Sequence, residues 1–147
     1  MARILIAIGQ IVGLVLVITV LVISALALRR VRLVRQGGVD VALRMNPNAA
    51  GRGWHQGVGR YRGDGFAWFS LSSLRSGPDR VLERERLQIV ERRGPTPPES
   101  YAVPNGSIVL RCRTGVDELE LAMRQDALTG FLSWLESAPP SANPWTP

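Results

Sequence analysis

Residues 107–123, SIVLRCRTGVDELELAM, decide the fold class of the folded part of the chain, because their apolar and charged side chains alternate as in a β-hairpin. With the loop at residues 114–117, both faces of the hairpin are consistent in one register: Cys112 with Leu119, Leu110 with Leu121 and Ile108 with Met123 on one face, and Arg113 with Glu118 and Arg111 with Glu120 on the other. A shift by one residue would spoil both faces. The sequence therefore predicts antiparallel sheet here, with Cys112 as a small buried apolar group instead of a reactive thiol.

An amphipathic helix is predicted directly after the hairpin, from Asp126 as the N-cap to about Ser137. Its apolar residues follow the spacing i, i+3, i+4, i+7 and form one stripe that can pack on a sheet: Leu128, Phe131, Leu132 and Leu135. The last ten residues, 138–147, carry four prolines and no charge. They are predicted to form a flexible tail.

Short β-prone runs precede the hairpin and are separated by turn residues. Residues 54–61 and 65–71 flank Arg62-Gly63-Asp64, residues 80–83 and 87–92 follow, and residues 101–103 form a further extended piece. The glycines at 51, 53, 57, 59, 63 and 65 are all odd-numbered, so those within one strand would leave one face bare; this favours bulges and close backbone packing in a strongly bent first hairpin, with a ligand groove as the alternative. Together the elements predict a mainly β (α+β) domain, a bent antiparallel sheet or barrel of six or seven strands closed by one C-terminal amphipathic helix. That layout resembles the pleckstrin-homology superfold, which hosts many kinds of binding site.

An uncharged apolar run of 25 residues, 4–28, precedes all of these elements. As a helix it would be about 37 Å long, enough to cross a hydrocarbon core of about 30 Å. The sequence therefore predicts a transmembrane helix. A cleavable signal peptide is the alternative, since Ala25-Leu26-Ala27 fits a small-x-small cleavage site, but the length of the run and the arginines after it favour a retained anchor.

Basic residues flank the run unevenly. One arginine, Arg3, precedes it, and four follow it closely: Arg29, Arg30, Arg32 and Arg35. The positive-inside rule then predicts an outer N-terminus and a cytoplasmic C-terminal domain, with an extracytoplasmic domain as the alternative. The four arginines orient the helix, and they are also candidates for contact with anionic lipid head groups. Residues 36–147 hold 13 arginines and 12 acidic residues, so the chain's net charge of +6 gives little support for nucleic-acid binding.

These patterns divide the chain into five segments. They are an N-terminus (1–3), a transmembrane helix (4–28), a basic juxtamembrane segment and linker (29–52), a soluble domain (53–137) and a Pro-rich flexible tail (138–147). Within the linker, residues 39–43 could extend the helix or form a short turn.

Catalytic and metal chemistry finds little support in the composition. One Cys and one His exclude a Cys/His zinc site, and all 18 basic residues are arginine, which excludes lysine-dependent chemistry. A hydrolase using His55 is the remaining enzymatic alternative, yet the chain has no nucleophile-elbow motif. The segments 83–86 and 91–93 alternate in sign, which predicts a solvated face with local ion pairs. We therefore expect no enzyme, no cofactor and no metal.

One candidate ligand or partner surface remains. Four arginines lie on or beside the first loops, close in sequence to Trp54, Tyr61 and Trp68: Arg60, Arg62, Arg75 and Arg80. They could hold an anionic lipid or a phosphorylated ligand. The alternative is that the arginines lie on solvated loops and the tryptophans in the core.

Four segments carry a resemblance to a known family: residues 53–58 (GWHQGV), 60–63 (RYRG), 73–80 (SLRSGPDR) and 128–137 (LTGFLSWLES). On them the chain resembles an actinobacterial family of short membrane proteins catalogued as domain of unknown function 2550. The resemblance implies a single N-terminal span and no established activity. The sequence thus predicts a single-pass, membrane-anchored binding or scaffold module that holds an anionic lipid or a protein partner of the same membrane at the inner leaflet.

Overall fold

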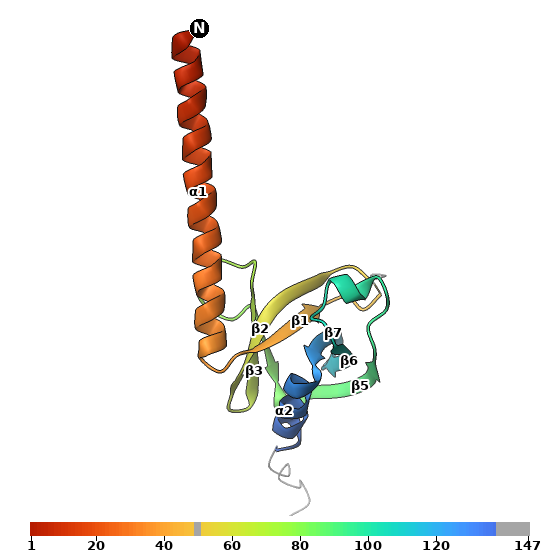
Figure 1. The fold of residues 1–147 in the computed structure, drawn as a ribbon. Coiled ribbons are helices and arrows are strands. Elements are labelled where there is room, and N and C mark those ends of the chain that lie inside the picture. Colours follow the sequence, from red (N-terminus) through yellow and green to blue (C-terminus); the bar gives the residue numbers. More distant parts are fainter. Residues whose placement is uncertain (49–50, 138–147) are drawn as a thin grey trace, which may run out of the picture.

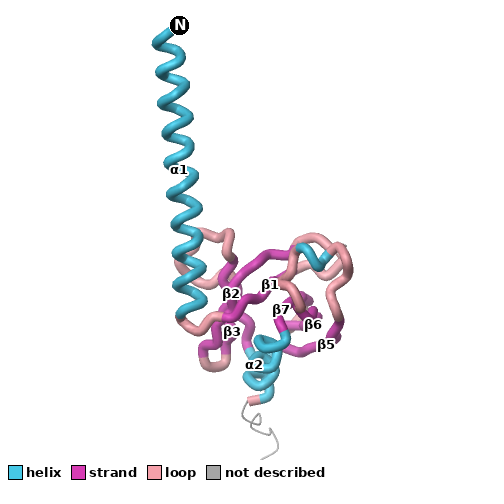
Figure 2. Tube along the Cα trace, viewed as in Figure 1, coloured by secondary structure: helices cyan, strands magenta, loops and turns pink. Residues whose placement is uncertain are grey.

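The structure is a computed structural model in which residues 1–48 and 51–137 are described. One long helix leads into a curled antiparallel sheet, and a short helix lies against the sheet (Figures 1 and 2). The seven strands lie in the order β4-β3-β2-β1-β7-β6-β5. The elements are α1 (Ala2–Arg35), β1 (Val39–Arg44), β2 (Trp54–Arg62), β3 (Gly65–Ser70), β4 (Arg80–Glu83), the 3₁₀ turn η1 (Arg84–Arg86), β5 (Leu87–Arg93), the 3₁₀ turn η2 (Glu99–Tyr101), β6 (Ser107–Thr114), β7 (Asp117–Arg124) and α2 (Gln125–Glu136).

The predicted hairpin is confirmed as β6 and β7. Its register pairs Cys112 with Leu119 and Arg111 with Glu120, and Thr114 pairs with Asp117 across a two-residue turn. Gly115 occupies that turn with a φ of 64°, a left-handed conformation that glycine adopts without steric cost. The predicted fold class, a bent antiparallel sheet with one C-terminal helix, is likewise confirmed (Figure 1).

The predicted linker is wrong in its middle. Residues 39–44 neither extend the helix nor form a turn, but make β1, which pairs with β2 on one side and with β7 on the other. The sheet therefore starts at Val39 instead of after residue 52. Likewise, α1 does not stop at the end of the apolar run but continues through the arginines to Arg35. From Val41 to Arg44 the strand is buried on both faces, as expected for a strand with a neighbour on each side and chain packed on both faces.

The inner face of the sheet holds the main core. Trp68 of β3 donates its indole N–H to the carbonyl of Val41, 2.9 Å away, so the first and third strands are tied through the interior. Gly59 of β2 leaves room for the Phe66 ring, where a Cβ atom would collide with it. The predicted bare face of the first hairpin is thus present, and aromatic rings fill it.

The helix α2 packs on β6 and β7 and covers one end of this core. Leu128 and Phe131 of the predicted stripe are fully buried, and Leu132 and Leu135 are half-buried at its edge. The helix begins one residue before the predicted N-cap, so that Asp126 lies in its first turn instead of capping it. The predicted Pro-rich tail lies outside the described residues.

The outer face of the sheet is covered by two separate pieces of chain. The loop of residues 94–106 lies over β1, β7 and β6, where Val103 packs with Ala42, Val109 and Ala122. Residues 99–101 of this loop form the turn η2, not the extended piece predicted for 101–103. The C-terminal turns of α1 pack against β2, so both faces of the sheet are shielded.

Candidate functional site

The place where α1 meets the sheet is the first candidate site. Only Gln36, Gly37 and Gly38 separate α1 from β1. Gly38 lies so close to Val58 of β2 and to the Leu33 carbonyl that a Cβ atom there would collide with both. The loop between β3 and β4, residues 71–79, rises beside the helix (Figure 1). Asp79 fixes the base of this loop, since its carboxylate accepts the backbone N–H of Ser70 at 2.8 Å.

A groove of about 480 Å³, here called the α1 groove, lies between the helix and this loop. Its lining divides into an apolar and a basic part and contains no carboxylate: Ala25, Leu28, Leu33, Phe69, Leu74 and Ser76, with Arg29, Arg32 and Arg75. Both terminal nitrogens of Arg29, Nη1 and Nη2, are enclosed and have no hydrogen-bond partner within residues 1–48 and 51–137. The guanidinium groups that the groove offers to an anion are those of the exposed Arg32 and Arg75.

The structure brings together part of the predicted arginine set. Arg75, predicted on a loop, lies in the α1 groove with two of the juxtamembrane arginines, Arg29 and Arg32. Arg30 lies on another side of the helix, in a cavity of about 150 Å³ that Asp40 and Pro104 also line. Arg35 is exposed at the helix end. The sequence does not predict this cluster, because it depends on the chain returning to the helix after three strands.

The other predicted arginines lie elsewhere. Arg60 donates from Nη1 to the side-chain oxygen of Gln36 at 2.8 Å, just after the end of α1. Arg62 is exposed at the end of β2. Arg80 of β4 pairs with Trp68, so it belongs to the face opposite Arg60. The four arginines predicted as one surface therefore do not form one cluster.

A buried ionic cluster on the outer face of the sheet was missed by the sequence analysis. Glu120 of β7 forms a close ion pair with Arg44 of β1, and Arg93 of β5 reaches Glu120 at 3.1 Å. Glu99 of η2 completes the cluster, 3.0 Å from Arg44 and 2.7 Å from Arg93. The Trp54 ring covers the Arg44 guanidinium at 4.9 Å.

The solvated face predicted for residues 91–93 is therefore wrong at Arg93, and the predicted pairing of Glu120 with Arg111 gave no sign that Glu120 is buried. The loop of residues 94–106 covers them, and Glu99 and Glu120 are among the most buried side chains of the chain. Ion pairing with Arg93, together with the backbone N–H of Thr96 at 2.9 Å, lowers the pKa of Glu99 to about 2. The stability that Glu99 contributes is thus fully present above its unfolded pKa of about 4.3 and is lost as the pH falls toward 2. This cluster ties the loop to three strands, which is a structural role.

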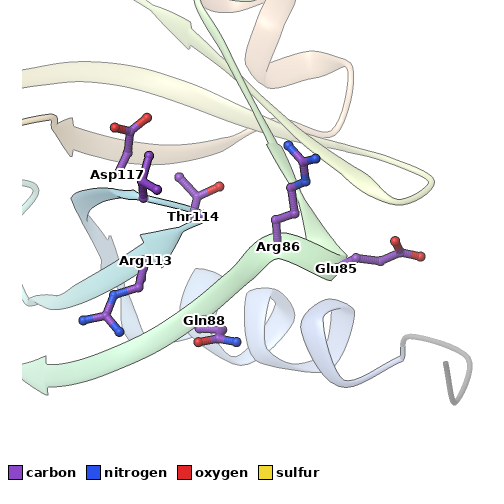
Figure 3. A pocket seen from close by; sticks show the side chains of 8 residues that line it. Glu85, Arg86, Gln88, Arg113, Thr114 and Asp117 are labelled. Carbon is purple, nitrogen blue, oxygen red and sulfur yellow. The ribbon is translucent and has the colours of Figure 1, made fainter. Parts of the chain in front are cut away.

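An open hollow of about 590 Å³ lies at the other end of the sheet (Figure 3). Its lining comes from η1, the start of β5 and the β6–β7 turn, and mixes both signs of charge: Glu85, Arg86, Gln88, Arg113, Thr114, Gly115, Val116 and Asp117. Figure 3 shows the charged side chains pointing apart instead of converging. The described residues also contain no group of three or more side chains that could hold a metal ion. This hollow therefore lacks the convergent polar groups of a small-molecule site.

The two residues considered for covalent chemistry have contrasting environments. His55 is exposed on β2, and the described part of the chain gives its ring no hydrogen-bond partner. Cys112 is completely buried on β6. Burial and the nearby charge of Glu120 raise the pKa of its thiol to about 12. The prediction that Cys112 is a buried apolar group is confirmed.

The native protein is expected to resist thiol alkylation. A maleimide reagent reacts with the thiolate, and the thiolate of Cys112 is both enclosed and disfavoured by its raised pKa. Mass spectrometry should therefore find no adduct after incubation of the folded chain at pH 7, and one adduct per chain after incubation in denaturant. Rapid labelling of the folded chain would contradict the assignment.

Comparison with known proteins agrees with the sequence resemblance. The family model described as protein of unknown function (DUF2550) matches residues 15–141. An uncharacterized protein of Mycobacterium leprae is 43% identical over 87% of this chain and 90% of its own length, and an uncharacterized protein of Mycobacterium tuberculosis is 41% identical over the same shares. No solved structure matches the chain. On this match over most of its length, the chain belongs to the DUF2550 family of proteins of unknown function.

Proposed function

We propose that this protein is a non-enzymatic, single-pass membrane module that holds its β-domain against the inner leaflet and binds a partner in or on the same membrane. The observation that carries the proposal is the short connection between helix and sheet. The described chain contains one helix long and apolar enough to cross a membrane, α1, and three residues later the chain is already in the sheet. A domain so attached cannot move far from the bilayer that holds its helix.

The packing of α1 supports an anchor that is retained after insertion. The helix continues without a break through Ala25-Leu26-Ala27, the possible cleavage site, and its following turns pack on β2. Cleavage after Ala27 would separate these turns from the apolar run that orients them. A cleavable signal peptide, by contrast, is removed from the mature protein and is not expected to pack on the domain that it exports.

Confinement to the membrane surface makes weak binding sufficient. A tether as short as residues 36–38 raises the effective concentration of a membrane-bound partner to about the millimolar range. A module of this kind needs neither a deep pocket nor a high intrinsic affinity. The shallow hollows at both ends of the sheet fit that role better than they fit catalysis.

Reporter fusions at the C-terminus test the orientation. A cytoplasmic domain is expected to give a fluorescent green fluorescent protein fusion and an inactive alkaline phosphatase fusion, because four arginines follow the span. The matched control carries the same reporters behind a cleavable signal peptide. Phosphatase activity in the native fusion would contradict the cytoplasmic assignment and favour the extracytoplasmic alternative.

Crosslinking in native membranes tests the binding role. The chain contains no lysine, since all 18 basic residues are arginine, so amine-reactive reagents would react only at the N-terminus. A photo-reactive amino acid at chosen surface positions avoids this restriction. The proposal expects a discrete adduct with a membrane component from some surface positions and none from others. Uniform adducts with abundant soluble proteins from every position would contradict it.

A further inference from the structure

The folded domain has two distinct ends. The β2–β3 turn, η1 and the C-terminus of α2 gather at one end, where the Trp134 indole donates to the Gly63 carbonyl at 2.9 Å. The β3–β4 loop and the loop of residues 94–106 gather at the other, where Gln56 donates to the Ala102 carbonyl at 3.3 Å. Arg30 of α1 shares a cavity with Leu71 and Pro104 from these two loops. This second end turns toward the N-terminal part of α1, which is the apolar part (Figure 1).

Each loop at that end exposes one large apolar or aromatic side chain. Leu74 is 82% exposed at the β3–β4 loop, and Tyr101 is 92% exposed on η2. Single exposed apolar residues are common on proteins. Leu74, however, lines the α1 groove together with Ala25 and Leu28, which belong to the apolar run of the helix. Its surroundings in a membrane would therefore be lipid rather than water.

The α1 groove changes from apolar to basic along the helix. Ala25 and Leu33, at the two extremes of its helical lining, are about 12 Å apart along the axis, and Arg29 and Arg32 lie between the middle of this span and its C-terminal end. The head-group layer of one leaflet is about 5 to 8 Å thick. The groove thus spans the depth over which a phospholipid changes from acyl chain to phosphate. Its basic part offers Arg29, Arg32 and Arg75, and its lining holds no carboxylate that would compete with a phosphate.

We propose that this end of the domain lies on the anionic membrane surface, with Leu74 and Tyr101 inserted among the lipids and a lipid phosphate bound between Arg29, Arg32 and Arg75. The inference rests on the proposed function only in requiring α1 to span the membrane. The exposed guanidinium groups of Arg32 and Arg75 then donate to that phosphate, and the Nη1 and Nη2 atoms of Arg29, which are enclosed and lack a protein partner in the described chain, join them after the Arg29 side chain turns into the groove. Guanidinium groups favour phosphate oxygens because they can donate two parallel hydrogen bonds.

Site-specific fluorescence tests the insertion in the full-length chain. Leu74→Cys and Tyr101→Cys place a label at the proposed surface, and Val116→Cys is the matched control, since Val116 is 99% exposed on a turn at the other end. The native Cys112 does not interfere, because it is buried. Each variant is labelled with the environment-sensitive dye NBD and reconstituted into nanodiscs of phosphatidylcholine with phosphatidylglycerol.

The expected result is a blue-shifted emission at positions 74 and 101, with quenching by iodide several-fold weaker than at position 116. Lipids brominated on the acyl chain should quench position 74 and leave position 116 unchanged. Equal iodide quenching at positions 74 and 116 would overturn the proposal. Protection of position 74 in native membranes but not in nanodiscs would also overturn it, since a protein partner would then cover the loop.

Lipid selectivity tests the phosphate site. Arg75→Gln should lower the preference for phosphatidylglycerol over phosphatidylcholine about fivefold, as expected for one arginine near an anionic surface, measured by native mass spectrometry of bound lipids. Arg86→Gln, an exposed arginine in the hollow at the other end, should leave the preference unchanged. Equal effects of both variants would overturn a specific site. The fluorescence and lipid-selectivity measurements do not depend on which leaflet is contacted. Their outcome is therefore independent of the outcome of the reporter fusions.

Discussion

Glu120→Ala is expected to lower the free energy of unfolding of the β-domain by about 3 to 5 kcal/mol. Glu120 is fully buried and pairs with both Arg44 and Arg93. Its removal leaves Arg44, itself buried, with less compensating negative charge in a region that water does not reach. A buried guanidinium without sufficient partners costs far more than a lost surface contact.

Urea unfolding of the full-length chain in detergent micelles measures this effect. Tryptophan fluorescence is a direct probe, because the Trp54 ring lies over Arg44. The control is Glu118→Ala on the same strand, whose side chain is 39% exposed and pairs with the exposed Arg113 at 3.1 Å. Such a surface pair contributes about 0 to 1 kcal/mol. Similar losses of unfolding free energy for both variants would show that the buried ionic cluster stabilises the outer face of the sheet no more than a surface ion pair does.

Phe131→Ala is expected to lower the free energy of unfolding by about 3 to 5 kcal/mol. Phe131 is fully buried, and its ring meets the Phe66 ring edge-on with centroids 5.3 Å apart. Phe66 in turn fills the space left by Gly59. Truncation would open a cavity between α2 and the sheet. The neighbouring strands cannot move in to fill it, because backbone hydrogen bonds to the adjacent strands hold them in place.

The same urea titration checks this prediction, with Ser133→Ala as the control on the same helix. Ser133 is exposed and donates only to the Thr129 carbonyl one turn earlier. Its replacement should change stability by less than about 0.5 kcal/mol. Retention of wild-type stability by Phe131→Ala would mean that α2 is not required to close the sheet.

The parts of the fold that the sequence predicts are those determined by neighbouring residues. The β6–β7 register follows from two faces that agree only in one alignment, and all five predicted pairs occur. The apolar stripe of α2 is likewise local. β1 was missed because its partners are far along the chain, Val41 pairing with Met123 of β7 and with Gly57 of β2. A short run between glycines and an Asn-Pro turn carries no sign of such partners.

Long separation in sequence also explains why the buried ionic cluster was missed and why the arginines gather in a different set from the predicted one. Arg44 and Glu120 are separated by 76 positions, so the sequence around either residue does not indicate its partner. One clue was available, since small residues flank both positions, Ala42 on β1 and Ala122 on β7, and would admit a covering loop. Arg75 meets Arg29 and Arg32 only because the β3–β4 loop returns to the helix.

The central place of β1 also determines the order in which the sheet can assemble. Strands β1 to β4 and strands β5 to β7 each form a run of consecutive strands, and one seam, between β1 and β7, joins the two halves. Contacts within each half are close in sequence, whereas the seam waits until residue 124 has been synthesised. Until then β1 has no partner on the side that β7 will occupy, and such an open strand edge is the part of a nascent sheet most prone to pair with another chain.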